Sequence, residues 1–271
     1  MNTETRRAGY ALLGVLLWAG GCSRPAQPPP AAEAKSDTAS VSTPQVPTRR
    51  LLVRVFYRGR APVAVPVPTS DCPPGDASVA DNPFSRSSDF ALGGVAVWVS
   101  NPGSNRPVSR EPTVVRLRHC RFEPSRLAVA AGTRLRFVNE DPLVHSLVST
   151  AESNPKLDAG LPFPGMSADL VLPAAELGVR VGSRRFPGMT ATVAVVNSAW
   201  STITEEDGAA ILLDPPPGTL SISAWHPDLG TVRVDVEVPE AGDVPLTIEF
   251  PESALADESK RRSQAVRPGA R

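Results

Sequence analysis

The sequence predicts an all-β protein, and three observations lead to that prediction. The chain of 271 residues contains 30 Pro and 20 Gly, which is typical of many short strands joined by turns. Short apolar or alternating runs follow one another from residue 51 to residue 250. Beyond the N-terminal segment, no window of twelve residues shows helical periodicity. An antiparallel β-sandwich is the expected outcome.

The N-terminal segment has the composition of an export signal. Two arginines precede an apolar run, residues 8–19, that is too short to span a bilayer. Residues 19–22 read AGGC, which resembles the lipobox at which bacterial lipoprotein precursors are cleaved and lipidated. We therefore expect residues 1–21 to be a signal peptide and Cys22 to anchor the chain in a membrane. The resemblance implies the periplasmic face of the outer membrane, and an ordinary secretory signal is the alternative.

Both ends of the remaining chain are expected to be disordered. Residues 22–49 are rich in Pro, Ala and Ser and cannot bury enough apolar surface to offset chain entropy, so they predict a tether. Residues 251–271 are polar and basic and predict a frayed tail, with contact to anionic headgroups or phosphates as the alternative. The formal net charge of zero gives no indication of a nucleic-acid partner.

The folded middle of the chain contains twelve candidate strands. Residues 134–138 show the clearest period of two, because Leu135 and Phe137 share one face and two arginines share the other. The candidates are Leu51–Tyr57, Gly94–Ser100, Thr113–Arg118, Arg134–Val138, Val144–Ser149, Ala168–Leu172, Val179–Gly182, Thr190–Val196, Ala209–Leu213, Thr219–Trp225, Val232–Val238 and Pro245–Phe250.

Two segments of this middle carry a motif. The first, residues 119–150, reads HCRFEPSRLAVAAGTRLRFVNEDPLVHSLVST, and the second, residues 179–196, reads VRVGSRRFPGMTATVAVV. The first contains an F-x-P element, a Gly turn, and N-x-D followed by a His, at Phe122, Pro124, Gly132, Asn139, Asp141 and His145. Together the segments resemble those that bear the copper ligands in plastocyanin-like cupredoxins, as found in methylamine-utilisation proteins. The family's second segment is C-x2-H-x2-M.

The resemblance implies the fold, but the metal site is broken. Ser183 stands where the family has its Cys ligand, Phe186 stands where it has its second His, and only His145 and Met189 remain. A type-1 centre needs two imidazoles and a thiolate, with a weak axial Met. A Ser hydroxyl is a poor copper ligand and Phe cannot coordinate. We therefore expect no copper, and the alternative is an altered site that uses His145, Met189 and Met166.

The resemblance implies a cupredoxin-like Greek-key β-sandwich over residues 50–197. A second resemblance follows it. Residues 202–230, TITEEDGAAILLDPPPGTLSISAWHPDLG, have turn dipeptides DG and PG and a W-H pair, and they are similar to carboxypeptidase-regulatory-like β-domains. This implies an additional small β segment over 198–250, with Trp225 as a core anchor and His226 at a sheet end. The pairing of residues 50–100 with 198–250 in a second sandwich is left open.

Two cysteines remain besides Cys22. In an exported protein such a pair predicts a disulfide, and related plastocyanin-like proteins carry cysteines at positions that match Cys72 and Cys120. The bridge would close a loop of roughly fifty residues and contribute about 4 kcal/mol. A redox-active or copper-binding pair is the alternative. If His119 lies in a strand, it points away from its neighbour Cys120, so the two would not share a metal ion.

No catalytic motif is present. The sequence has no nucleophile elbow, metalloprotease helix, phosphate-binding loop or dinucleotide fingerprint, so we expect no enzyme. The sequence favours a lipid-anchored, non-catalytic binding or structural module of the cell envelope, whose end loops dock an envelope protein or polymer. The alternative function is copper binding or electron transfer through an altered site.

Overall fold

The computed structural model describes residues 49–61, 84–103 and 107–265, with the side chains of 260–265 excepted. These residues belong to one compact unit, Gln45–Arg271. The predicted signal, Cys22, Cys72 and all of the predicted tether except Arg49 lie outside the described residues. Within the described part, no helix is both long and apolar enough to cross a bilayer.

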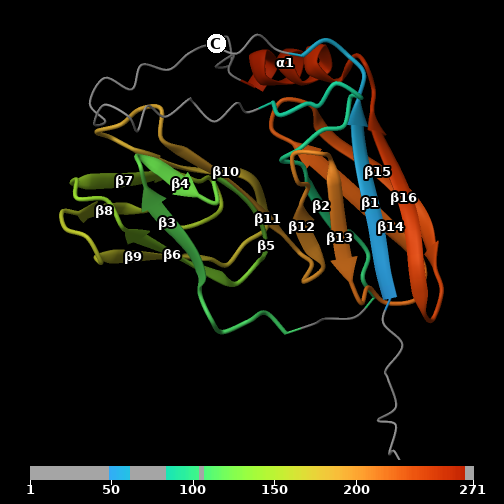
Figure 1. The fold of residues 1–271 in the computed structure, drawn as a ribbon, viewed down its shortest axis with the longest axis horizontal. Coiled ribbons are helices and arrows are strands. Elements are labelled where there is room, and N and C mark those ends of the chain that lie inside the picture. Colours follow the sequence, from blue (N-terminus) through green and yellow to red (C-terminus); the bar gives the residue numbers. More distant parts are fainter. Residues whose placement is uncertain (1–48, 62–83, 104–106, 266–271) are drawn as a thin grey trace, which may run out of the picture. The chain divides into compact units, whose positions relative to one another are not determined.

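One continuous stretch of chain forms a sandwich of two sheets, which we call the central sandwich (Figure 1). Its strands are β3 Thr113–Arg118, β4 Arg121–Glu123, β5 Arg126–Ala130, β6 Thr133–Asn139, β7 His145–Thr150, β8 Asp158–Leu161, β9 Ser167–Leu172, β10 Glu176–Ser183 and β11 Thr190–Val196. One sheet has the order β5-β11-β10-β7-β8 and the other β4-β3-β6-β9. The β3–β6 and β5–β11 pairs are parallel, and the remaining pairs are antiparallel.

The core of the central sandwich forms because alternate residues of each strand face the opposite sheet. Leu135 and Phe137 of β6 are fully buried, as the period of two predicts, and they join one apolar cluster with Leu147 of β7 and Val181 of β10. Each such side chain stabilises the fold by about 1.5–3 kcal/mol. The sheets are therefore held together by apolar burial along most of their length.

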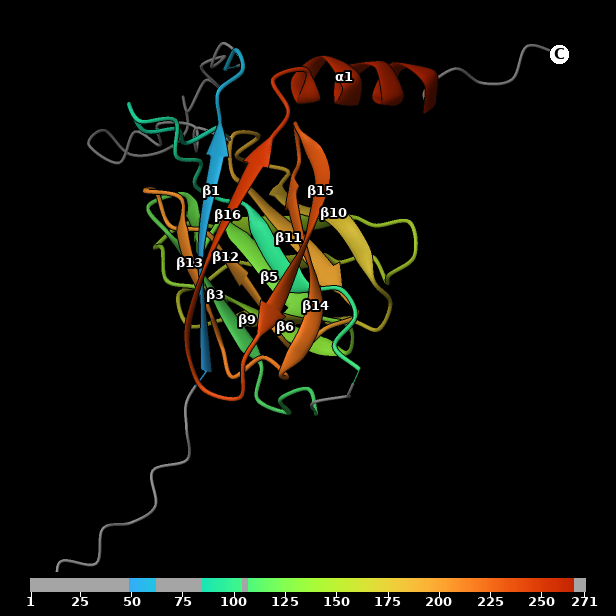
Figure 2. The ribbon, with the colours of Figure 1, turned by 90° about the vertical axis from the view of Figure 1, so that its right-hand side faces the viewer.

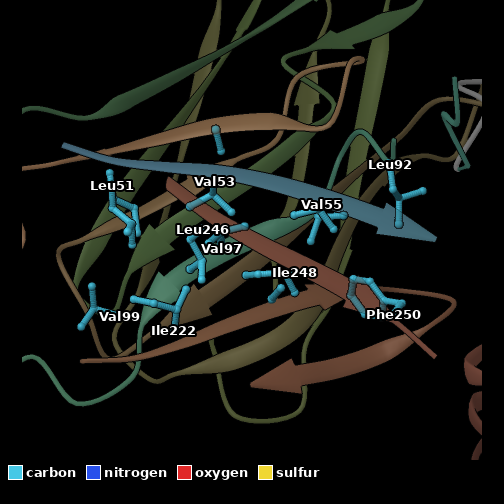
Figure 3. Packing of buried hydrophobic residues seen from close by; sticks show 14 of the residues in the cluster. Leu51, Val53, Val55, Leu92, Val97, Val99, Ile222, Leu246, Ile248 and Phe250 are labelled. Carbon is cyan, nitrogen blue, oxygen red and sulfur yellow. The ribbon is translucent and has the colours of Figure 1, made fainter. Parts of the chain in front are cut away.

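The remaining strands form a second pair of sheets from both ends of the described chain, which we call the composite sandwich. Its strands are β1 Arg49–Tyr57, β2 Ala96–Val99, β12 Ser201–Ile203, β13 Ala209–Leu213, β14 Gly218–His226, β15 Gly230–Val238 and β16 Gly242–Phe250. The sheet orders are β13-β1-β16 and β12-β2-β14-β15. Figure 3 shows the apolar side chains that fill the space between these sheets, among them Leu51, Val53, Val55, Val97, Ile222, Leu246 and Ile248. The predicted class, an all-β sandwich with an additional β-domain, is confirmed.

The composite sandwich answers the pairing that the sequence left open. β1 runs parallel to β16 over nine pairs, from Arg49 opposite Gly242 to Tyr57 opposite Phe250, and antiparallel to β13. β2 pairs with β12 and β14. The boundaries predicted at 50–197 and 198–250 therefore differ from the observed pairing, because the first two strands complete a sandwich with the last five.

The C-terminal segment also differs from its prediction as a disordered tail over 251–271. Residues Ala254–Ala265 form helix α1, which follows β16 (Figure 2). Ser253 directly precedes the helix and supports its first turn. Its hydroxyl donates to the Asp257 carboxylate and its carbonyl accepts from the Asp257 amide. Ala254 is buried against the composite core and Leu255 packs on it, so tertiary contact stabilises a segment that lacks a continuous apolar face.

Candidate functional site

Both segments of the sequence motif meet at one end of the central sandwich. The strand pairs that fix this arrangement are Val138–Ser167, His145–Leu161, Ser183–Leu147 and Leu117–Asn139. Because these residues lie at the ends of their strands, the β6–β7, β8–β9 and β10–β11 loops and the β3–β4 turn lie together. We call this the site end.

Asn139, the last residue of β6, holds two of these loops. Its side chain is fully buried, and its amide nitrogen donates to the carbonyls of Leu143 and Leu161 at 2.9 Å each. Its backbone N–H donates to Met166 and its carbonyl accepts from Gly165, at 2.9 and 2.7 Å. A single buried amide therefore fixes the β6–β7 and β8–β9 loops against each other.

Asp141 carries out the same task for the β3–β4 turn. Its carboxylate is 5 % exposed and accepts hydrogen bonds from the backbone N–H groups of His119 and Cys120, at 2.6 and 3.0 Å. Both of these residues have positive φ, a conformation that non-glycine residues adopt at a cost. The carboxylate satisfies both amides of the turn, and the Asp141 N–H in turn donates to the Asn139 side chain at 2.9 Å.

His145 is buried beside this carboxylate. Its Nε2 lies 2.9 Å from Asp141 Oδ2, and the residue has no exposed surface. A carboxylate accepts, so Nε2 carries a proton, and in a neutral ring Nδ1 then holds a free lone pair. Among the described residues, His145 Nδ1 is the one buried side-chain nitrogen or oxygen without a hydrogen-bond partner. The first motif segment therefore presents one nitrogen, His145 Nδ1, whose lone pair could bind a metal ion and whose position is fixed.

The second segment places the aromatic ring of Phe186 next to the His145 ring. Phe186 lies in the β10–β11 loop, and its ring centroid is 5.3 Å from that of His145 at an interplanar angle of 57°. The Phe186 N–H donates to the Ser183 hydroxyl at 3.2 Å, and its carbonyl accepts from the Met189 N–H at 2.9 Å. Ser183, Phe186 and Met189 are all buried. The loop is thus closed by its own hydrogen bonds and by packing.

These residues do not fit a type-1 copper centre. The available donors are one imidazole nitrogen and the thioether of Met189, while a thiolate and a second imidazole are needed. Within the part of the chain that the structure describes, no three His, Cys, Asp or Glu side chains gather into a group that could hold a metal ion. Met166, the third residue of the alternative site, is 39 % exposed, whereas Met189 belongs to the buried core.

Three large apolar side chains are exposed at the site end, beside charged residues of the β10–β11 loop. Val144, Phe163 and Met166 are 47 %, 68 % and 39 % exposed, and they come from the two loops that Asn139 joins. Arg185 lies over the Phe186 ring at 5.6 Å from the centroid. Sequence reasoning did not single out Val144 or Phe163, although an apolar residue between prolines in the letters PFP is a signal that could have identified Phe163.

The structure also bears on the neighbours of Cys120. His119 and Cys120 form a tight turn between β3 and β4, so the strand geometry considered for His119 does not apply to it. Cys120 is buried and is not a free thiol. Cys72 lies outside the described residues, and the pairing of Cys72 with Cys120 stays a prediction.

No protein-family model matches the chain, and a search of curated proteins gives no significant match. Part of the chain is similar in structure to three copper proteins. One is the copper-containing nitrite reductase (NirK) from Thermus scotoductus SA-01, at 18 % identity over 34 % of this chain and 24 % of that chain, with a TM-score of 0.28. This chain thus spans about a quarter of the nitrite reductase.

The other two are cupredoxins that this chain covers over most of their length. A mutant of amicyanin in its reduced state matches at 22 % identity over 32 % of this chain and 85 % of that chain, with a TM-score of 0.26. A purple cupredoxin from Nitrosopumilus maritimus matches at 15 % identity over 31 % of this chain and 98 % of that chain, with a TM-score of 0.27. All three TM-scores lie below 0.5.

Proposed function

We propose that this protein is a cupredoxin-like binding or structural module of the cell envelope that has lost type-1 copper and does not catalyse a reaction. The observation that carries the proposal is the position of Phe186. Its ring packs on His145, where the family has a second copper-binding imidazole, and it is only 7 % exposed. An apolar ring in that place excludes both a ligand and water, so the site end is a packed structural element.

The binding surface that we propose is the apolar cap of the site end, formed by Val144, Phe163 and Met166. These side chains sit on loops that buried Asn139 holds in one conformation. A fixed apolar surface loses little entropy when a partner covers it. An envelope protein or polymer with an apolar surface is the partner that this cap fits.

The remaining part of the proposal is the anchor. The AGGC letters at residues 19–22 support lipidation of Cys22, and the tether that follows would hold the folded part near the membrane surface. Mass spectrometry of the N-terminal peptide from the membrane fraction tests it. A diacylated Cys22, lost in Cys22→Ala together with membrane retention, supports the anchor, and an unmodified peptide that begins elsewhere contradicts it.

A second candidate function, copper binding at an altered site, is favoured by one observation. His145 Nδ1 is buried and has no partner among the described residues, and a thioether of the same core, Met189, stands at the family's axial position. Such a pair would suit Cu(I) better than Cu(II), because thioether sulfur is a soft ligand.

Copper titration of the mature chain separates the two functions. The protein is treated with a chelator and titrated with Cu(II) and, under reducing conditions, with Cu(I), and bound metal and the visible spectrum are recorded. We expect no stoichiometric copper in either state. One tightly bound copper that is lost in both His145→Ala and Met189→Ala, but retained in the control Phe163→Ala, whose ring is 68 % exposed, would establish the second function instead.

A further inference from the structure

The outer face of the β4-β3-β6-β9 sheet is rich in arginine. The buried inward residues of these strands are apolar except Thr133 and Asn139 of β6, and the period of two places every second residue outside. Five arginines share this outer face, two on β3, two on β6 and one on β4: Arg116, Arg118, Arg134, Arg136 and Arg121. We call this surface the arginine face, and it belongs to the sheet opposite β10 and β11.

The arginine face has fewer carboxylates than arginines. Glu140 is shared between Arg116, at 3.0 Å, and Arg118. Asp169 forms a two-bond pair with Arg136, at 2.8 and 2.9 Å, which lowers the pKa of the Asp169 carboxyl. Glu123 is the third carboxylate, on β4. Glu111, just before β3, also interacts with the charge of Arg136, so five arginines and four carboxylates lie on or beside this face.

The charges of the arginine face are accessible. The side chains of Arg116, Arg118 and Arg136 are 48 %, 46 % and 41 % exposed even in their ion pairs. Exposed ion pairs of this kind contribute little to stability, so their guanidinium groups can exchange one anionic partner for another at small cost. Val114 and Val171 are exposed within the same sheet and add apolar contact area.

We propose that the arginine face binds the phosphate groups of an anionic phospholipid bilayer. A guanidinium binds phosphate through two parallel hydrogen bonds. Basic residues at an anionic membrane surface contribute additively, and an open sheet face matches an extended charged surface better than it matches a small ligand. Lipidation of Cys22, which belongs to the proposed function, would bring the chain to a membrane surface on which such a bilayer is present.

The test measures vesicle binding without the anchor. The chain from residue 22 onward, with Cys22→Ser, is sedimented with vesicles of phosphatidylcholine alone and of phosphatidylcholine mixed with phosphatidylglycerol. We expect binding to the anionic vesicles only, with a partition coefficient that falls as NaCl is added. Because this protein lacks the lipidated cysteine, the vesicle result does not depend on whether Cys22 is lipidated in the cell. The copper titration tests the site end independently of both.

Two matched double variants assign the binding to the arginine face. R121E/R134E reverses two charges on that face, and R54E/R180E reverses two exposed arginines on other sheets. We expect the first pair to lower anionic partitioning by roughly tenfold or more, and the second by less than about threefold. R121K/R134K, which keeps the charges, should retain most of the binding and reports on folding.

Three results would overturn the proposal. The first is an absence of binding to anionic vesicles, and the second is equal binding to neutral vesicles. The third is an equal loss in the two charge-reversal variants, which would place the binding in the basic C-terminal segment or in the overall charge of the chain.

Discussion

The two motif segments at the site end are kept in place by different forces. The first, from Asn139 to His145, is held by buried side-chain hydrogen bonds, and Asp141 alone accepts three of them. The second, from Ser183 to Met189, is held by short-range hydrogen bonds within its own loop and by burial of Phe186 and Met189. The first segment is thus fixed by a buried polar network and the second by packing.

This difference predicts how each segment responds to the substitution of its side chains. Loss of the Asp141 carboxylate would leave two backbone amides and His145 Nε2 without their acceptor, which is costly. The second segment faces no such constraint, because an apolar ring can fill the space of an imidazole and contribute packing in its place. The polar network therefore fixes the first segment, whereas the second segment depends on the volume of its buried side chains.

Restoring the two ligands gives the largest expected effect. The S183C/F186H variant supplies a thiolate and a second imidazole beside His145 Nδ1 and Met189, in the spacing that the family uses. We expect it to bind one Cu(II) per chain with an intense visible absorption, where the unaltered protein binds none. Adding His145→Ala to this variant is the control. A colourless restored variant that is still folded would show that the frame of the first segment is no longer suited to copper.

Asp141→Ala tests the first segment directly. The change leaves two backbone N–H groups and His145 Nε2 without their acceptor in a buried site. We expect a loss of about 3–5 kcal/mol in the free energy of unfolding, measured by urea denaturation. Asp158→Ala is the control, since that carboxylate is 65 % exposed in its ion pair with Arg184. A loss below about 1 kcal/mol would mean that the carboxylate does not hold the turn.

Phe186→Ala tests the second segment, which is held by the packing of the Phe186 ring. Removing the ring leaves a cavity next to His145 and should lower the free energy of unfolding by about 3 kcal/mol. The control Phe163→Ala, in which the ring is 68 % exposed, should change it by less than about 0.5 kcal/mol. If the two variants were equally stable, the packing of Phe186 on His145 would not be what holds the second segment.

The fold class and the strands with strong alternation could be predicted from the sequence because they depend on local pattern. Three strands, Thr113–Arg118, Thr190–Val196 and Ala209–Leu213, have their predicted bounds. Short strands such as β12, of three residues, have too little pattern to be recognised. The parallel β1–β16 pair joins residues about 190 positions apart, and no local signal in β1 specifies its partner.

Site residues could be predicted from their side-chain types and spacing, but contacts that depend on an unusual backbone conformation could not. The motif identified His145 and Asp141, but not that the Asp141 carboxylate holds His119 and Cys120, because two non-glycine residues with positive φ leave no mark in the sequence. A similar limit applies to Trp225, predicted as a core anchor. The register of β14 places it half-buried and puts His226 fully inside, at the end of the strand as predicted.

The smallest effect is expected at the opposite end of the same sandwich, where a second carboxylate holds a loop. Burial opposes ionisation of Glu176, but hydrogen bonds from the Glu152 and Ser153 amides and the Asn154 side chain outweigh it and lower its pKa below 4.5. A carboxyl with a lowered pKa in the folded state stabilises the protein above the unfolded-state pKa, and this contribution is lost as the pH falls through the folded-state value.

Glu176→Gln should therefore cost about 1 kcal/mol at neutral pH, and this cost should diminish as the pH falls through the folded-state pKa of Glu176, measured by urea denaturation at neutral and acidic pH. The control Glu206→Gln, on an exposed turn, should change the free energy of unfolding by less than about 0.5 kcal/mol at neutral pH. Because Glu176 is less buried than Asp141, its loss should cost less than Asp141→Ala. Equal losses from the two variants would mean that the site end has no special role for its polar network and that any loop-holding carboxylate of this sandwich is equivalent.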